Sequence, residues 1–364
     1  MSGVTPQGRE MHVTFVAESV ENNSIGRTYC LWLLADRLGW STTTLATRGD
    51  SLWAPLRDSK FASTVRRVEP GKINSAVPAD TDLMIACKPF PESLGVAIRV
   101  ARERGLGLIV DVDDPDLEAR LRLNSPLMAV LRWLRYPKRS IVDRENARWT
   151  RALPSFASNP WLQQHWGGVL IPHAREDQGS AGYSDSSAPR VVFVGTNRAH
   201  KGIGLLRDAV SALRGDGFSL TVTDVPPGDA RPGEHWVGRT TLADGMQLVR
   251  GADIVALPSS PDRFSVGQLP AKLVDAMMFG RAIAVSRVTP MPWAVGDAGI
   301  IFEPDSLPEL IAALRELQSP EVRRGLGQRA RERALEEFSV DALSPRFRDE
   351  CERVATAGWR EPTW

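Results

Sequence analysis

The sequence predicts an α/β protein built from two doubly wound, Rossmann-like domains that face each other across a cleft. Short apolar runs alternate with helical patterns from end to end, as expected of parallel strands joined by crossover helices. This periodicity is lost over 173–189, where Ser, Gly, Asp and Ala dominate as in a linker or long surface loop. A chain of 364 residues is long enough for two such domains.

The first predicted domain spans 1–173. A helix near 27–38 follows its first strand and ends at Gly39, which suits a helix C-terminus. The strand candidates of this domain are the apolar runs at 11–17, 42–47, 82–87, 107–112 and 168–172. Further helical patterns lie near 92–104, 126–135 and 140–151.

A linker at 174–189 leads into the second predicted domain, 190–339. Ser306 and Glu309 have the spacing of a capping box at the start of one of its helices. Strands are expected at 190–195, 218–223, 253–259 and 281–286. Helices are expected near 200–214, 242–250, 270–279, 306–317, 320–337 and, at the end of the chain, 340–356.

Composition narrows the class of partner. The net charge is about +1, so no overall field would draw the protein to nucleic acid. The three cysteines, Cys30, Cys87 and Cys351, have no metal-ligand spacing and are expected to be reduced. No signal peptide and no apolar run of about 18 residues is visible, so we expect a cytoplasmic protein.

Two loops of the second half carry the strongest chemical pattern, since ligands of open α/β sheets bind beyond the carboxyl ends of the strands. Arg198 and Lys201 follow the strand at 190–195, and two cations beside a helix start suit a pyrophosphate. The alternative is a solvated turn. Asp275 follows Pro270 by a turn and a half of helix, where a carboxylate suits the two hydroxyls of a ribose. The alternative is a solvated or salt-bridged residue.

Together, VVFVGTNRAHKG and ADIVALPSSPDRFSVGQLPAKLVDAMMFGRAIAVS resemble the donor half of family 4 glycosyltransferases, over roughly 190–317. The resemblance is weaker in the first half, through GLIVDVDD and SNPWLQQHWGGVLIPH. It implies the GT-B fold, with 340–364 packing back on the first domain. It also implies a retaining hexosyl- or deoxysugar-transferase that moves a sugar from a nucleoside diphosphate sugar to a hydroxyl acceptor. Carried over, Lys201 with Arg198 stabilises the diphosphate, and Asp275 holds the ribose.

The sequence departs from that family at two places. Thr196 stands where the family usually has Arg, and Gly267 stands where it has the first of two glutamates. A subset of the family reads Pro-x-Lys-Leu-x-Glu instead, and this chain has Pro-x-Lys-Leu-x-Asp at 270–275. Backbone groups are therefore the remaining candidates for donor contacts. The donor-binding candidates besides Asp275 are Gly195, Thr196, Gly267, Gln268, Ala271 and Lys272.

Candidates for the acceptor side lie in the first half. Asn23, Ser24 and Gly26 are expected in a loop before a helix, where Gly26 would let a ligand approach the backbone; a simple turn is the alternative. Asp113 and Asp114, with Asp111, follow a strand and could bind acceptor hydroxyls, cap a helix or, less favoured, hold a divalent metal. A further candidate, at the border of the linker, is His173. No metal or other cofactor is expected.

Several functional questions stay open at this point. The basic, amphipathic stretch 126–139 either packs on the first domain or rests on an anionic membrane. The acceptor is a small molecule, a polysaccharide or a lipid-linked sugar. A GT-B epimerase or phosphorylase, or a catalytically degenerate partner subunit that binds nucleotide sugars, are the alternative functions.

Overall fold

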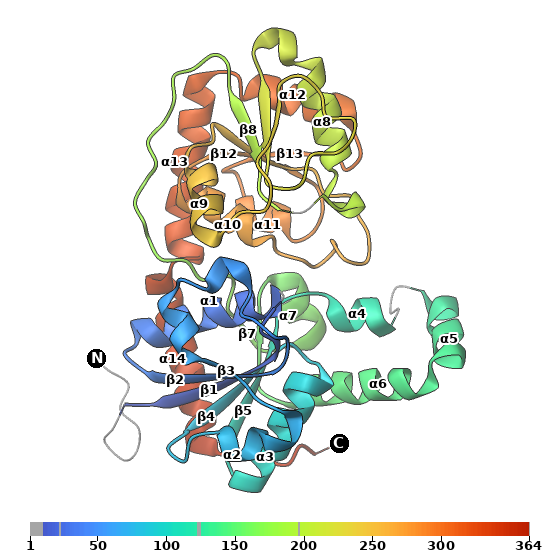
Figure 1. Ribbon diagram of the computed structural model, residues 1–364, viewed down its shortest axis with the longest axis vertical. Helices are drawn as coiled ribbons and strands as arrows, with labels where there is room; N and C mark the ends of the chain where they lie inside the picture. The colour runs from blue at the N-terminus through green and yellow to red at the C-terminus, as the bar shows by residue number, and fades with distance from the viewer. Residues whose placement is uncertain (1–9, 22, 122–124, 196, 364) are drawn as a thin grey trace. The chain divides into compact units, whose positions relative to one another are not determined.

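The structure, a computed structural model, describes residues 10–21, 23–121, 125–195 and 197–363. It divides into two compact units (Figure 1). The first unit extends to Ala174 and takes up the chain again at Val340, and the second is Arg175–Ser339. Each unit is built on one parallel sheet with helices packed against it, which confirms the predicted α/β class of two Rossmann-like units.

The sheet of the first unit reverses its strand order between β1 and β4, so a switch point lies at their carboxyl ends. Its described strands stand in the order β3-β2-β1-β4-β5-β6-β7, and all pairings are parallel. The strands are β1 (His12–Ser19), β2 (Ser41–Arg48), β3 (Val65–Arg67), β4 (Leu83–Cys87), β5 (Gly107–Val112), β6 (Ser155–Ala157) and β7 (Val169–Leu170).

The helices of the first unit include the last one of the chain, which packs against α1 and β5. They are α1 (Asn23–Arg37), α2 (Ile73–Ala76), α3 (Val96–Arg104), α4 (Asp116–Leu121), α5 (Pro126–Arg135), α6 (Pro137–Ala152), α7 (Pro160–Trp166) and α14 (Val340–Ala357). The start of α1 differs from the expectation. Residues 23–26 form its first turn, because the helix begins at Asn23 and not near Arg27.

The sheet of the second unit has the described order β10-β9-β8-β11-β12-β13, again with parallel pairings throughout. A switch point therefore lies between β8 and β11. The strands are β8 (Arg190–Phe193), β9 (Ser219–Val222), β10 (Glu234–Trp236), β11 (Ile254–Leu257), β12 (Ala282–Ser286) and β13 (Ile300–Phe302).

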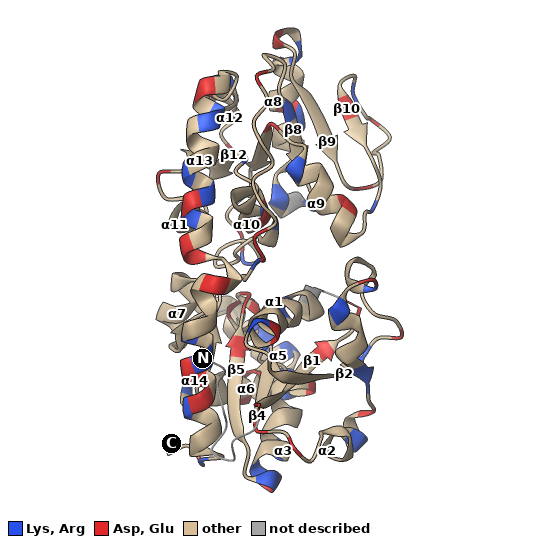
Figure 2. Ribbon diagram, turned by 90° about the vertical axis from the view of Figure 1, so that its left-hand side faces the viewer, with Lys and Arg blue, Asp and Glu red and all other residues tan. Residues whose placement is uncertain are grey.

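The helices of the second unit enclose a continuous apolar core with this sheet. They are α8 (Ile203–Ala212), α9 (Leu242–Arg250), α10 (Ala271–Met278), α11 (Met291–Val295), α12 (Leu307–Glu316) and α13 (Pro320–Glu337). Ser306 caps α12, since its side chain accepts a hydrogen bond from the amide of Glu309. The carboxylate of Glu309 accepts from the amide of Glu303. Figure 2 shows acidic and basic residues interspersed along α13 and α14.

The segment expected to be a linker has no helix or strand within 176–189, all of which the structure describes. It is nevertheless tied to the second unit by arginine side chains. Arg323 donates to the carbonyls of Ser184 and Ser186, and Arg331 pairs with Asp177 at 2.8 Å. These contacts make the segment an ordered part of the second unit's surface.

Among the described residues, every helix is too short or too polar to cross a membrane.

Candidate functional site

The loop after β8 brings backbone and cationic groups together at the carboxyl end of the second sheet. Gly195 has a φ of 133°, and its amide donates to the hydroxyl of Thr223 at 2.7 Å. The amide of Asn197 donates to the carboxylate of Asp224 at 2.6 Å, so the loop after β9 holds the loop after β8 in place. Arg198 is exposed, and Lys201 ends a short 3-10 turn that leads into α8.

Gly202, the residue before the first residue of α8, lies very close to the loop after β11. Its φ is 66°, and a Cβ atom there would be 1.8 Å from the carbonyl oxygen of Pro258. The amide of Ser260 donates to the carbonyl of His200 at 2.9 Å. Glycine is therefore required where these two loops meet, and the start of α10 is brought beside the loop after β8.

Two lysine side chains converge on Gly195. A Cβ atom on Gly195 would lie 3.1 Å from Nζ of Lys272 and 3.5 Å from Nζ of Lys201. Lys272 comes from the first turn of α10, and its ammonium lies 3.5 Å from the centre of the Phe193 ring. From the sequence we expected only the backbone of Lys272 to contribute. The structure adds its side chain to the candidate site, and the signal available in the sequence was its position in the first turn of the helix after the second loop.

The pKa values of the basic side chains in this cluster are lowered. Burial and, to a smaller extent, the charge of Arg198 together lower the pKa of Lys201 to about 8, against the opposing effect of Asp224. Burial, followed by the charge of Lys201, lowers the pKa of Lys272 well below its usual value. Burial also lowers the pKa of His200. Like charges held together in a partly buried place raise the free energy of the free protein, and a bound anion would relieve that cost.

Asp275 is buried and salt-bridged, so it is not a solvated residue. Arg175 donates through Nε to Oδ1 of Asp275 at 2.5 Å. The two residues are 100 positions apart, and Arg175 is held by its own amide, which donates to the carbonyl of Phe338. The ribose role of Asp275 stays a prediction, and the pairing orients the carboxylate that this role would use.

The backbone amides of Gly267 and Gln268, which the sequence offers as candidates for donor contacts, are already hydrogen-bonded within the protein. The amide of Gly267 donates to the carbonyl of Thr289 at 2.8 Å, and that of Gln268 to Ser265 at 3.1 Å. The loop uses these groups to hold its own shape. Ala271 and Lys272 lie in the first turn of α10, where amides have no carbonyl partner within the helix. Thr196 lies outside the described residues.

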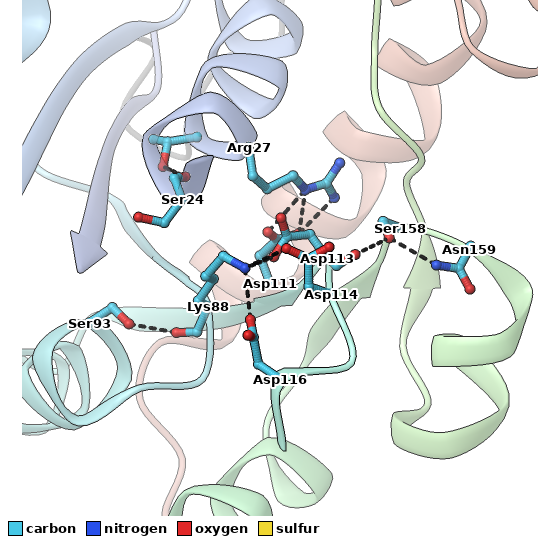
Figure 3. A network of polar contacts seen from close by, with 11 residues as sticks. Ser24, Arg27, Lys88, Ser93, Asp111, Asp113, Asp114, Asp116, Ser158 and Asn159 are labelled. Atoms are coloured by element: carbon cyan, nitrogen blue, oxygen red, sulfur yellow. Dashed lines mark hydrogen bonds and ion pairs between the residues drawn. The ribbon is translucent and has the colours of Figure 1, made fainter. Parts of the chain in front are cut away.

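A second polar cluster lies at the carboxyl ends of β4 and β5 in the first unit (Figure 3). Nζ of Lys88 lies 3.1 Å from Asp113, 2.8 Å from Asp114 and 2.7 Å from Asp116. Lys88 has a positive φ of 71°, a strained value for a residue with a side chain. Its carbonyl accepts from the hydroxyl of Ser93 at 2.6 Å, which holds that backbone in place.

The charges of this cluster do not balance. Burial alone would lower the pKa of Lys88, but the three surrounding carboxylates outweigh it and raise that pKa well above its usual value. Burial raises the pKa of Asp113 to about 8, because one ammonium shared among several carboxylates cannot offset it. Asp113 is therefore the innermost acid, while Asp114 and Asp116 are more accessible.

A divalent metal is a poor fit to this cluster. Oxygen atoms of Asp113, Asp114 and Asp116 lie within 4.8 Å of one another, as metal ligands would. However, the ammonium of Lys88 already lies among them and supplies the positive charge. A metal ion would have to displace a buried, hydrogen-bonded cation, which costs free energy.

Beside this cluster, Arg27 and Asp111 form a fully buried ion pair. Arg27 donates through Nε and Nη2 to the carboxylate of Asp111; Nη2 also donates to the carbonyl of Ile171, and Nη1 donates to the carbonyl of Pro172. The pair connects α1, β5 and the segment that directly follows β7. Asp111 thus has a structural partner and is not available to a ligand.

The other predicted residues of the first unit lie near this pair. Ser24 is buried in the first turn of α1, and its carbonyl accepts from Thr28. Gly26 is helical, so the expectation of a loop glycine there is wrong. Nothing is described of the Asn23 side chain. His173 is buried next to Pro172, the partner of Arg27.

Comparisons with known proteins find a family match in the second unit and solved structures of the same fold. Residues 188–319 match the family model described as glycosyl transferases group 1, a range that includes both loops of the second unit. MMP alpha-(1->4)-mannosyltransferase of Mycolicibacterium hassiacum is 40% identical over 101 residues. That alignment covers 27% of this chain and 23% of the mannosyltransferase, so the chain matches about a quarter of this curated relative.

Solved structures match nearly the whole chain. HepE of Anabaena, in complex with UDP and glucose, has a TM-score of 0.71 at 13% identity over 93% of this chain and 99% of that one. Sucrose-phosphate synthase from Thermosynechococcus elongatus has a TM-score of 0.68 at 14% identity over 96% and 100%. The fold is therefore that of the GT-B glycosyltransferases, two Rossmann-like domains in one chain.

Proposed function

We propose that this protein is a retaining glycosyltransferase of the family 4 type, which moves a sugar from a nucleoside diphosphate sugar to a hydroxyl acceptor. The observation that carries the proposal is the convergence of Lys201 and Lys272 on Gly195, at the carboxyl end of β8. The group 1 family match over 188–319 includes all three residues. HepE, which shares the fold, binds UDP and glucose.

The donor diphosphate would bind where these ammonium groups meet. Its negative charge would restore full protonation of Lys201, whose pKa is about 8 in the free protein. The first-turn amides of α10 add the partial positive charge of a helix N-terminus. Asp275, oriented by Arg175, would accept hydrogen bonds from the ribose.

Catalysis would come from stabilising the leaving group. Breaking the bond between the sugar and the diphosphate moves negative charge onto the phosphate oxygen. Cations fixed at that oxygen before the reaction lower the barrier, typically by several kcal/mol. Lys201 and Lys272 are held by packing, whereas the exposed Arg198 can move onto the phosphate when it arrives.

The acceptor would use the first unit. Asp114 and Asp116 are the accessible carboxylates of the Lys88 cluster, whereas Asp113 is enclosed. A carboxylate held by an ammonium can accept a hydrogen bond from a sugar hydroxyl without losing its own partner.

The test is a thermal-shift panel with UDP, GDP, dTDP and ADP, followed by assays for nucleoside diphosphate release from the matching sugar nucleotide. A nucleotide present at 100 times its dissociation constant should add about 2.7 kcal/mol of stability. We expect Lys201→Ala and Arg198→Ala to abolish turnover with unchanged circular dichroism. Near-normal turnover in both variants would contradict the proposal. Nucleotide binding without transfer to any acceptor would instead favour a non-catalytic, nucleotide-sugar-binding subunit.

A further inference from the structure

An apolar surface lies on α5 and the first turns of α6, in the first unit (Figure 1). We call it the α5 surface. Among the described residues, nine of the thirteen exposed large hydrophobic side chains belong to it. They are Leu127, Met128, Val130, Leu131, Trp133, Leu134, Tyr136, Ile141 and Val142. An exposed patch of this kind marks a place of interaction in a soluble domain.

α5 exposes its apolar face, whereas an ordinary surface helix buries that face. Leu127, Val130, Leu131 and Leu134 have the spacing i, i+3, i+4, i+7 and so share one face. They are 70%, 55%, 49% and 64% exposed, and within α5, described in full, no residue is buried. The polar side chain of Arg132 instead reaches inward to Asp143 of α6. Figure 1 shows α5 at the outer end of α6, away from the sheet.

The charge around this surface has one sign. Within 126–144, all of it described, the exposed charged side chains are Arg135, Lys138, Arg139 and Arg144. The acid of this range, Asp143, is buried and lies close to Arg132 and Arg120, and the first exposed acid beyond it is Glu145. The surface therefore combines an exposed apolar stripe with uncompensated positive charge.

We propose that the α5 surface binds an anionic lipid bilayer, with α5 lying in the plane of the membrane. Apolar side chains would enter the acyl boundary while the basic ones contact lipid phosphates. Trp133 and Tyr136 are suited to the headgroup level. A helix of ten residues is only about 15 Å long, so it lies on a bilayer and does not cross one.

Positive charge argues against a second copy of this chain as the occupant. A symmetric dimer through the α5 surface would bring the same four exposed cations of each copy together, and like charges facing each other oppose association. An anionic bilayer matches both the charge and the apolar stripe.

Vesicle flotation tests the proposal without measuring turnover, so it is independent of the proposed function. The full chain should float with vesicles of phosphatidylcholine and phosphatidylglycerol and stay behind with phosphatidylcholine alone. Leu131→Glu/Leu134→Glu should abolish flotation, while Val237→Glu, at an apolar residue of the second unit that is as exposed as Leu131, should not. Arg135→Gln/Lys138→Gln should lower the partition coefficient about 30-fold, at roughly fivefold for each cation removed.

Three results would overturn this assignment. The first is a wild-type chain that does not float with anionic vesicles, and the second is a Leu131→Glu/Leu134→Glu variant that floats like the wild type. The third is a wild-type dimer in analytical ultracentrifugation that this variant dissociates, without flotation of either protein, which would assign the surface to a second copy. Circular dichroism controls for folding, and the exposure of both leucines predicts no change in it.

Discussion

Replacing Lys272 by Met separates the binding of an anion from the stability of the fold. The substitution removes the ammonium but keeps an apolar stem over the ring of Phe193. If Lys272 serves a diphosphate, the variant should bind nucleoside diphosphates more weakly. Because its charge is unfavourable in the free protein, the same variant should fold at least as stably as the wild type.

The magnitude follows from the geometry at Gly195. Distances of 3.1 and 3.5 Å from one point place the nitrogens of Lys272 and Lys201 at most 6.6 Å apart, the sum of the two. Two full charges at that separation repel by about 2.5 kcal/mol at an effective dielectric constant of about 20. Loss of one charge-assisted hydrogen bond to a phosphate costs about 1.5–3 kcal/mol, which weakens binding roughly 10- to 150-fold.

Isothermal titration calorimetry with UDP measures the affinity, and thermal unfolding measures the stability. Lys60→Met, at an exposed lysine of the first unit, is the matched control and should change neither. Wild-type affinity in Lys272→Met would refute the assignment of this side chain. A large loss of stability in the same variant would show that the ammonium supports the fold instead.

Three further predictions concern pH, backbone and core. Affinity for UDP should fall as pH rises above about 8, by up to tenfold per pH unit, because Lys201 binds the anion only when protonated. Calorimetry across pH 7–10 measures this affinity, and a flat profile would contradict the prediction. Gly202→Ala should destabilise the second unit by about 1–3 kcal/mol or more in urea unfolding, because its Cβ would meet the carbonyl of Pro258. The control Gly204→Ala, whose Cβ meets open space in α8, should stabilise the unit by about 0.5–1 kcal/mol. Equal effects would be inconsistent with the close loop contact. Arg27→Met should lower the free energy of unfolding by about 3–5 kcal/mol, because Asp111 stays buried without its partner. The double variant Arg27→Met/Asp111→Leu should lose less stability than the two single variants together, and additive losses would argue against the pair.

Periodicity predicted most of the fold, since both units are alternating parallel strands and helices. The run at 107–112 and the strand β5 coincide because a strand buried on both faces is mostly apolar, and its one charged residue, Asp111, is paired with Arg27. Helix starts were less predictable. Asn23 begins α1 four residues early because polar residues in a first helical turn look like a loop in the sequence.

Side-chain partnerships across the fold were beyond the sequence. Asp275 and Arg175 are 100 positions apart, and only the folded backbone shows that they meet. Lys88 follows an apolar strand and precedes the acids by 25 positions or more, so the pattern revealed the acids without their cation. In both cases the residue types were visible and the distance between them was not.

Hydrogen–deuterium exchange of the full chain, with and without UDP, tests the central claim most directly. A diphosphate bound at Gly195 should slow exchange at the loop through Lys201 and at the first amides of α10, Ala271 and Lys272. Lys272→Met should weaken that protection at a fixed nucleotide concentration. Binding of UDP without protection at either segment, or with protection confined to the first unit, would contradict the assignment of the donor site.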